Sequence, residues 1–417
     1  MPRVAIVGGC RTPFVRAAGA LKELSFLDLG IHVTKALVRR LNLDANCIDE
    51  FIFGTVLLDP RLPNFAREVI LRSGLPASIS AHAISNNCIS GLVAATMLSE
   101  SIRSGRVKVG IAGGSESMSR PTLTLKSKAE DLFLRLARAK SAVERLKLLL
   151  SYRPSYIFPQ PPSPKEPSTG LTMGQHCEIT TKEFSIARAA QDAVALRSHQ
   201  RASRAQNDGI LGTEIEPLNG VIKDNLIRGD TTLEKLAKLK PVFDRSDKGT
   251  LTAGNSSSLT DGASVVCLMS DEEAKKQGKE IIGYIEGVEY AAIAPADGLL
   301  MAPGLSLPNL FKKHNLSVAS VDVFEIHEAF AAQVLANQSV WENGWQKFPN
   351  ISPIGKIPDE KINVNGGSLA IGHPFAATGG RLILSTVNEL KRRGAKKGVI
   401  SVCAAGAMGC AMLITRG

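Results

Sequence analysis

The sequence lacks paired cysteines. Its seven cysteines are scattered along 417 residues, and no two of them form a Cys-X-X-Cys pair. That distribution argues against a disulfide framework and against a zinc site of the paired-cysteine kind. We therefore expect free thiols, a reducing compartment and no bound metal.

Long hydrophobic runs and aromatic clusters are also missing. No apolar run approaches 18 residues, which excludes a membrane-spanning helix. The first predicted strand, "RVAIVGG", starts almost at once, with no recognisable signal peptide or Arg-rich presequence. Aromatic residues do not interleave with the basic ones, which argues against nucleic-acid binding. These absences predict a cytoplasmic protein with no nucleic-acid partner.

Positive charge is in excess, with a formal net charge of +11. Much of the excess is local, because residues 119–165 contain ten Lys or Arg and only three Asp or Glu. Such a balance suits an anionic partner, for example a phosphate-bearing cofactor or an anionic lipid.

Strand and helix patterns alternate in the first 115 residues and again in the C-terminal third. This alternation predicts an α/β architecture with a mixed sheet. Two stretches, 86–114 and 365–406, share one plan: an Asn/Gly turn, a small-residue helix, a basic turn and an apolar strand that ends in a Gly/Ala turn. The similarity predicts an internal duplication, with functional residues of the two halves meeting near a pseudo-twofold axis. Within the second half, "KINVNGG" (361–367) is expected to be a strand.

A segment of different texture separates the two halves. It is predicted to contain a basic helix over 129–153, a proline-rich link over 154–170 and a longer helix pair over 185–209. The predicted domains are an N-terminal half of 1–118 plus 250–272, an inserted loop domain of 119–249 and a C-terminal half of 273–417.

Cys88 is the first candidate for chemistry. It follows Ser85, Asn86 and Asn87, which are good helix N-cap residues, and precedes a predicted buried helix. The N-terminus of a helix lowers the pKa of a thiol, so the position suits a thiolate nucleophile. The alternative is that Cys88 is a small buried hydrophobic residue.

Three further candidates lie at predicted strand ends or helix starts, where α/β proteins place active sites. They are His327 in "FEIHEAFAAQ", His373 in "NGGSLAIGHPFAATGG" and Cys403 in "SVCAAGAMG". Taken singly, they have structural alternatives: a core histidine, a turn cap and a packing residue. Together with Cys88 they form a working set, in which one thiolate attacks, one histidine takes its proton, the second binds an oxyanion and the second thiol moves a proton.

At this point the chain resembles the thiolase family almost from end to end. The motifs that carry the resemblance are "RTPF" (11–14), "NNCISG" (86–91), "GGSESMS" (113–119), "STGLTMGQ" (168–175), "RGDTT" (228–232), "TAGNSSSLTDGA" (252–263), "HEAFAAQ" (327–333), "NVNGGSLAIGHPFAATG" (363–379) and "CAAGAMG" (403–409). Within the family, "HEAF" and the long basic insertion resemble the thiolase β-subunit of fatty-acid β-oxidation trifunctional complexes.

The resemblance implies a duplicated fold of two βαβαβαββ halves with a five-layered α-β-α-β-α core. It implies thiolysis of medium- and long-chain 3-ketoacyl-CoA, with coenzyme A as co-substrate and no permanently bound cofactor. A homodimer or tetramer is expected on the same ground, and a hydratase/dehydrogenase α-subunit is a candidate partner. The basic helix 129–153 is either a solvated amphipathic helix or a docking element for that subunit or an anionic membrane.

Residue roles follow from the resemblance as well. Cys88 would take the acyl group, His373 would activate it, and Cys403 would protonate the leaving enolate and then deprotonate CoA. His327 stands where most thiolases carry an Asn that holds an oxyanion-hole water. The remaining implied positions are the backbone around Ala405 and Gly406 for a second oxyanion hole with the Cys88 N–H, Ser257 for the pantetheine arm, Met173 and Phe330 for its tunnel, and Arg228 for the CoA nucleotide.

Three departures from the family pattern concern pocket shape more than reaction: Ala407 and Ser258 replace common glycines, and Thr172 replaces a frequent histidine. The competing enzyme classes are a biosynthetic acetoacetyl-CoA thiolase and a decarboxylating ketoacyl synthase. "HEAF" and the insertion disfavour the former, and Cys403 disfavours the latter. A non-catalytic acyl-CoA carrier is a further alternative, which the four polar positions disfavour.

Overall fold

The computed structural model describes residues 1–156 and 158–417. They form two compact units: Met1–Arg120 together with Lys165–Gly417, and Pro121–Pro164. The first unit contains every strand of the described chain. Among the described residues, no helix combines the length and the apolar character needed to cross a bilayer.

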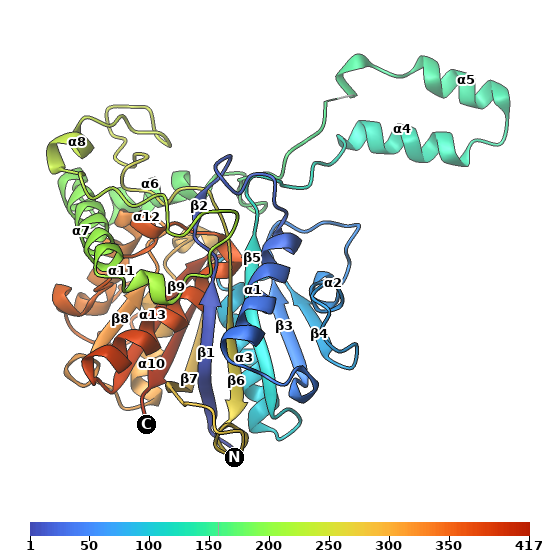
Figure 1. The fold of residues 1–417 in the computed structure, drawn as a ribbon. Coiled ribbons are helices and arrows are strands. Elements are labelled where there is room, and N and C mark those ends of the chain that lie inside the picture. Colours follow the sequence, from blue (N-terminus) through green and yellow to red (C-terminus); the bar gives the residue numbers. More distant parts are fainter. Residues whose placement is uncertain (157) are drawn as a thin grey trace. The chain divides into compact units, whose positions relative to one another are not determined.

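The strands of the larger unit form one ten-stranded mixed sheet (Figure 1). Nine of them follow the order β4-β3-β5-β6-β1-β7-β10-β9-β8, and the short β2 pairs with β6 off this path. The strand bounds are β1 (Val4–Arg11), β2 (Val15–Arg16), β3 (Glu50–Gly54), β4 (Ser80–Ile84), β5 (Val109–Glu116), β6 (Thr260–Ser270), β7 (Gly283–Ala292), β8 (Val323–Ile326), β9 (Lys397–Ala404) and β10 (Met408–Thr415).

The strand order repeats in the two halves of the sheet. The junction is short, because β1 pairs with β7 only through Val4–Ile6. On both sides of it, antiparallel pairs lead outward to parallel ones: β5 with β3 on one side, and β9 with β8 on the other. One expected strand is missing: residues 361–367 make a single parallel bridge, from Ile362 to Phe324, because the chain turns at Asn363, where φ is +44°.

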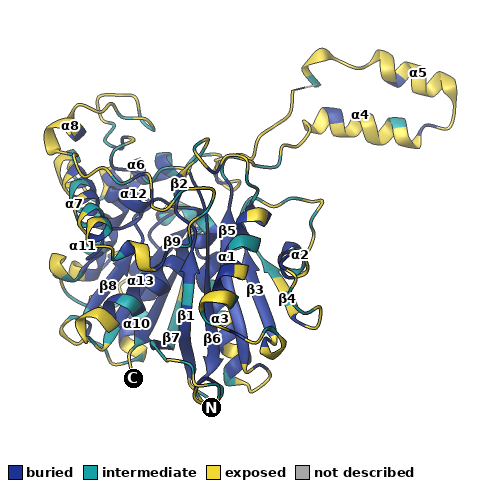
Figure 2. Ribbon diagram, viewed as in Figure 1, coloured by how far each residue is buried: buried dark blue, intermediate teal, exposed yellow. Residues whose placement is uncertain are grey.

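Helices cover the sheet in layers, and the buried core lies between the layers (Figure 2). Helices α1 (Phe26–Arg40) and α2 (Phe65–Arg72) pack on the outer face of the N-terminal half. Helices α3 (Ser90–Arg103) and α13 (Thr378–Arg393) form the central layer, where they contact each other and strands of both halves. Helices α10 (Pro303–Lys313) and α11 (Ala331–Asn343) cover the outer face of the C-terminal half. The predicted α/β class is therefore confirmed.

Two glycines let the starts of α3 and α13 approach closely. A Cβ at Gly91 would lie 2.7 Å from the Ala376 carbonyl oxygen, and one at Gly379 would lie 2.4 Å from the Leu92 nitrogen. Real side-chain carbons do not reach such distances to backbone atoms, so both positions need glycine. This contact brings the chain before α3 next to the chain before α13.

The inserted segment differs from the sequence-based expectation in two places. Instead of one basic helix over 129–153, there are two helices, α4 (Ser127–Arg138) and α5 (Ala142–Leu150). The break occurs because Ala139 is extended, with ψ 125°, and the Ser141 side chain caps a new helix by accepting from the Glu144 N–H. Conversely, the expected helix pair over 185–209 is one continuous helix, α7 (Arg188–Asn207).

The remaining helices connect these layers or flank them. Their bounds are α6 (Met173–Glu183), α8 (Leu233–Ala237), α9 (Asp271–Lys276) and α12 (Ser368–Ile371). The predicted domain division into 1–118 plus 250–272, 119–249 and 273–417 stays a prediction.

Candidate active site

Cys88, His327 and His373 converge although they are far apart in the sequence. Cys88 lies just before α3, His327 follows β8, and His373 lies between α12 and α13. The Cys88 Sγ is 3.2 Å from the His373 Nε2, and the two imidazole rings are 4.1 Å apart. The structure thus brings three of the four candidate side chains into direct proximity. The fourth, Cys403, lies near the end of β9, and the turn that follows it is bound to the Cys88 turn by the hydrogen bond from Asn87 to the Ala405 carbonyl.

The turn that carries Cys88 differs from the expected cap. Helix α3 begins at Ser90, and its N-cap residue is Ile89, which makes no side-chain capping bond. The Ser90 hydroxyl instead accepts from the Asn86 N–H and donates to the Asn87 carbonyl. Asn87 has φ +48°, a left-handed conformation that Asn tolerates better than most residues. The asparagines therefore shape a tight turn that presents Cys88, and they do not cap the helix.

The expected lowering of the Cys88 pKa is wrong. Burial raises the pKa of this thiol to about 12, and the nearby Glu116 acts in the same direction. The backbone N–H groups of Ala405 and of Cys88 itself oppose the rise, because they point toward the sulfur. The resting side chain is therefore a neutral thiol, which needs a base at the moment of attack.

His373 is positioned to be that base. Burial, and secondarily the Arg381 charge, lowers its pKa to about 3, so the imidazole is neutral at physiological pH. Its Nδ1 lies 2.6 Å from the Thr378 Oγ1. A ring that donates from Nδ1 to Thr378 has a free lone pair on Nε2, directed at the Cys88 thiol.

His327 is set up as the opposite tautomer of His373: its Nε2 carries the proton and can donate a hydrogen bond. Its Nδ1 lies 2.9 Å from the Ser368 Oγ, and that oxygen accepts a 3.1 Å hydrogen bond from Arg381 Nη2. With Arg381 donating, the Ser368 hydroxyl is free to donate to Nδ1, which leaves the proton on Nε2. The His327 Nε2 is buried without a hydrogen-bond partner, and burial holds the pKa of the ring well below its usual value. It is a neutral donor available to a substrate oxygen.

Glu325, which lies beside Arg381, is predicted to make the stability of the fold depend on pH. It lies 3.8 Å from Arg381, and both of its carboxylate oxygens are buried without a hydrogen bond. Burial raises its pKa from 4.5 to about 8, so its stabilising contribution is complete below about pH 4.5 and is lost as the pH rises through 8. We expect the free energy of unfolding to fall by on the order of 4 kcal/mol between pH 5 and pH 9 from this group.

Glu325→Gln should remove that part of the pH dependence. Denaturant unfolding of both proteins across the pH range measures it, with the wild type losing stability relative to the variant from about pH 5 up to about pH 8. Parallel stability curves for the two proteins would show that Glu325 titrates normally.

Cys403 is buried at the end of β9. Burial, followed by the nearby Cys88 and Cys177, raises its pKa well above the usual value, so it too rests as a neutral thiol. The turn after it is tied to the site: Asn87 Nδ2 donates to the Ala405 carbonyl at 3.0 Å, and the Gly406 N–H donates to Glu166 at 3.0 Å. Ala407 takes a left-handed φ of +55° in this turn, where the family commonly has glycine.

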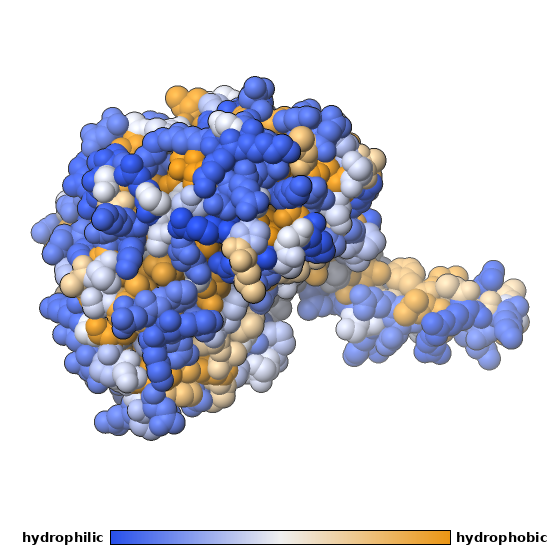
Figure 3. Space-filling model, turned by 90° about the horizontal axis from the view of Figure 1, so that it is seen from below, coloured by the Kyte–Doolittle hydropathy of each residue, from blue (hydrophilic) through white to orange (hydrophobic). Residues whose placement is uncertain are grey.

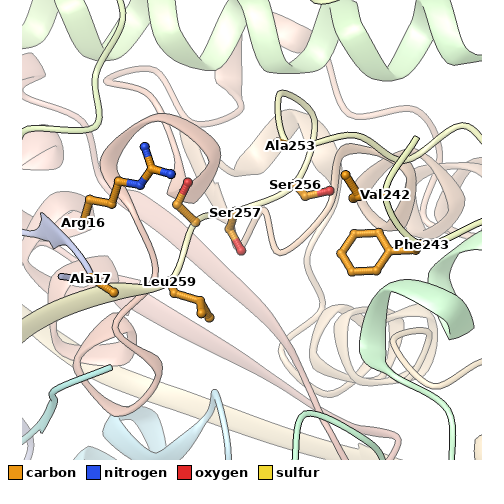
Figure 4. Close-up of a pocket in the computed structure, with 9 residues that line it drawn as sticks. Arg16, Ala17, Val242, Phe243, Ala253, Ser256, Ser257 and Leu259 are labelled. Carbon is orange, nitrogen blue, oxygen red and sulfur yellow. The ribbon is translucent and has the colours of Figure 1, made fainter. Parts of the chain in front are cut away.

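A pocket of about 380 Å³ lies beside these residues (Figure 4). Its wall includes the segment 256–259, in which Ser256 forms a β-bridge with Phe330 and Leu259 one with His373. Phe243 and Leu259 supply apolar surface, whereas Arg16 supplies a cation. The pocket therefore suits an extended ligand with both apolar and anionic parts.

The predicted CoA-binding residues lie in different places relative to the pocket. Ser257 lines the pocket. Met173 and Phe330 pack in one apolar cluster with Cys403 and Phe243, and the Phe243 and Phe330 rings are 5.7 Å apart, edge to face. Arg228 is exposed and is not among the nine residues that line this pocket.

Several supporting residues were missed by sequence reasoning. Thr378 and Ser368 orient the two histidines, Arg381 holds Ser368, and Asn87 ties the two catalytic turns together. Thr378, Ser368 and Asn87 lie inside motifs that the sequence analysis singled out. The polar residues within "GGSLAIGHPFAATG" were the available signal, since nothing else required hydroxyls there.

The regions that match known proteins extend over nearly the whole chain. Residues 4–272 match the thiolase N-terminal domain, and residues 279–416 match the thiolase C-terminal domain. A 3-ketoacyl-CoA thiolase of Pseudoalteromonas translucida is 41% identical over 421 residues, covering 99% of this chain and 96% of that protein. One of Photobacterium profundum is 41% identical over 423 residues, with the same coverage.

A solved structure agrees with these sequence matches. The crystal structure of the Bacillus anthracis acetyl-CoA acetyltransferase superposes with a TM-score of 0.83 at 31% identity, covering 100% of this chain and 99% of that one. Since both family models and near-complete relatives match, the chain belongs to the thiolase family.

Proposed function

We propose that this protein is a 3-ketoacyl-CoA thiolase, which cleaves 3-ketoacyl-CoA with CoA into acetyl-CoA and a shortened acyl-CoA. The observation that carries the proposal is the 3.2 Å contact between the Cys88 Sγ and a buried, neutral His373 whose other nitrogen is held by Thr378. A thiol and a fixed imidazole in this arrangement make a base-assisted nucleophile. The names of the relatives support the same reaction.

In the first half-reaction, His373 Nε2 takes the thiol proton as the Cys88 sulfur attacks the 3-keto carbon. The bond between C2 and C3 then breaks, and its electron pair leaves on the acetyl-CoA enolate. Cys403 protonates C2, which releases acetyl-CoA and leaves the shortened acyl chain on Cys88. His327 Nε2–H is the buried donor available to stabilise an oxyanion, a contribution worth about 10²–10³-fold in comparable enzymes.

In the second half-reaction, the Cys403 thiolate takes the proton of the incoming CoA thiol. The CoA sulfur attacks the acyl carbon, and the backbone N–H groups of Cys88 and Ala405 stabilise its oxygen, consistent with their orientation toward the Cys88 sulfur. Cys88 leaves as a thiolate and recovers its proton from His373. Each group thereby returns to its starting protonation state, and CoA serves as co-substrate.

We assign the pocket beside segment 256–259 to the CoA arm. Ser257 lines it, and the buried Ser256 hydroxyl has no hydrogen-bond partner, which leaves it available to a ligand amide. The Phe243–Phe330 pair connects this pocket to the cluster that contains Met173 and Cys403. Arg16 is the cation of this pocket, and Arg228 stays a candidate for the CoA nucleotide on the resemblance alone.

Thiolysis of a 3-ketoacyl-CoA series tests the proposed reaction. Loss of the substrate enolate absorbance should follow CoA addition for medium and long chains. Turnover of acetoacetyl-CoA only would favour the biosynthetic class, and decarboxylation without CoA would favour a ketoacyl synthase. No CoA-dependent cleavage at any chain length would reject the enzymatic assignment.

The smaller unit, Pro121–Pro164, suggests a docking role. Eight of its residues are Lys or Arg and three are Asp or Glu. Figure 3 shows apolar side chains along one edge of this unit and hydrophilic ones along the other. Exposed apolar residues include Phe133, Leu146 and Leu150, the last 78% exposed. We infer that it contacts an anionic membrane or a hydratase/dehydrogenase subunit, and that the larger unit forms a homodimer or tetramer as other thiolases do.

Deleting residues 125–160 should abolish binding to vesicles of anionic lipid, or co-purification with the partner subunit. Turnover of short-chain substrates should remain, because the catalytic residues and the pocket all belong to the larger unit. A matched variant, Leu149→Ser with Leu150→Ser, keeps the charge and should weaken vesicle binding by itself. If the deletion changes neither association, the docking inference is wrong.

A further inference from the structure

The Nε2 nitrogen of His327 is a buried polar atom that has no hydrogen-bond partner. The side chain is fully buried, and this nitrogen makes no hydrogen bond. The His327 ring lies beside Cys88 and His373, because one ring nitrogen of each histidine and the Cys88 sulfur all lie within 4.8 Å of one another. Of the two His327 nitrogens, Nδ1 is already bonded to Ser368, which leaves Nε2 as the available ligand atom. A thiol and two imidazoles are the side chains that borderline-soft divalent cations prefer.

We propose that Cys88, His327 and His373 form a binding site for a Zn²⁺-like cation, whose occupation blocks the nucleophile. The ligand atoms would be the Cys88 sulfur and the Nε2 atoms of both histidines. The ion is an inhibitor in this proposal, because the proposed thiolysis requires the same sulfur and nitrogen to be free.

The surroundings of the histidines fit metal ligands. Histidines that bind metals have their second ring nitrogen fixed by a hydrogen bond. Here the Nδ1 of His373 is held by Thr378 at 2.6 Å, and that of His327 by Ser368 at 2.9 Å. Ser368 can accept from His327 as well as from Arg381, so its hydroxyl permits the His327 tautomer with a free lone pair on Nε2.

The geometry and the charge of the site favour reversible binding of a metal ion. Metal bonds of about 2.0–2.3 Å need ligand atoms roughly 3.3–3.8 Å apart. The sulfur and the His373 Nε2, at 3.2 Å, are already close to that separation, and the other two pairs, which are within 4.8 Å, need an approach of at most about 1 Å. Three protein ligands leave one tetrahedral position for water, as in exchangeable sites rather than closed structural ones. The positive Arg381 beside both histidines opposes a dication and limits its affinity.

Binding should release a proton. A metal ion binds cysteine as the thiolate and histidine as the neutral imidazole, and a Cys thiol with its ordinary pKa carries its proton at neutral pH. Formation of the metal–sulfur bond displaces the thiol proton to solvent, while the two imidazoles bind without losing one. We therefore expect one proton to be released for each ion bound at neutral pH.

Cobalt titration of the full-length protein, without CoA, tests the proposal. Cys47→Ser is the background, because Cys47 is the exposed thiol and lies outside the active site. We expect one Co²⁺ per chain, a thiolate-to-cobalt charge-transfer band, one proton released per ion, and displacement of the band by Zn²⁺. Zn²⁺ should also protect Cys88 from alkylation.

Two further variants locate the ligands. Cys88→Ser should abolish the charge-transfer band, and His327→Asn should weaken Co²⁺ binding by at least about 10-fold. His82→Asn removes a half-exposed histidine outside the cluster and should change nothing. A band that survives Cys88→Ser, or an unchanged affinity in His327→Asn, would overturn the proposal. Because binding is read without substrate, its failure is distinguishable from a failure of the proposed thiolase reaction.

Discussion

Cys88→Ser is expected to lower kcat for thiolysis by about 10⁴-fold or more, because loss of a covalent nucleophile removes the reaction path itself. A serine hydroxyl is a weaker nucleophile than a thiol at neutral pH, even with His373 as its base. Because the side chains have nearly the same volume, the fold should be unchanged. Steady-state thiolysis and single-turnover release of acetyl-CoA measure the loss.

Cys47→Ser is the matched control, since this thiol is exposed and lies outside the site. It should leave kcat and KM at the wild-type values. If Cys88→Ser kept more than a few per cent of wild-type kcat, Cys88 could not be the acyl carrier.

His373→Gln is expected to lower kcat by about 10³-fold, within the range of 10²–10⁴ typical of a lost general base. The effect should be severe because the Cys88 thiol, with its pKa raised to about 12, does not ionise by itself at neutral pH. Activity of the variant should therefore rise steadily with pH up to about 9, whereas the wild type should not share that dependence. pH profiles of kcat/KM distinguish the two.

His327→Asn provides the comparison. This change replaces a neutral donor by another donor, and Asn occupies the position in most thiolases, so measurable activity should remain. Complete inactivity of His327→Asn would mean that His327 does more than stabilise an oxyanion. A His373→Gln variant with near-normal activity would remove the general base from the mechanism.

The sequence predicted the convergence of the site but not its electrostatics. Glycine-rich turns at strand ends identified Cys88 and His373, and Gly91 and Gly379 are what allow the two helix starts to meet. The pKa of Cys88 was predicted in the wrong direction, because a helix N-terminus is readable in sequence whereas the burial of a sulfur is not. Because the pKa of the Cys88 thiol is raised, the thiol must be deprotonated by His373 before it can attack.

Two secondary-structure predictions that were wrong failed for local physical reasons. The basic helix of 129–153 has continuous helical periodicity, yet Ser141 caps a second helix within it. Residues 361–367 have the apolar pattern of a strand, but the left-handed Asn363 ends the pairing after one bridge. In both cases a single polar residue, suited to a cap or a turn, outweighs the periodicity around it.

The supporting residues required tertiary structure. Ser368 and Thr378 could be suspected as polar residues in a catalytic motif, but their assignment to separate histidines depends on distances. Arg381 lies on α13, where the sequence offers no sign that its charge is buried beside the two imidazoles.

Trapping the acyl-enzyme tests the central claim most directly. The protein is mixed with a short acyl-CoA in the absence of free CoA, quenched in acid and digested, and the acylated peptide is identified by mass spectrometry. We predict a thioester on Cys88 that disappears when free CoA is added before the quench. An acyl group on Cys403 or on any other residue in place of Cys88, or no acylated peptide in a preparation that catalyses thiolysis, would contradict the account.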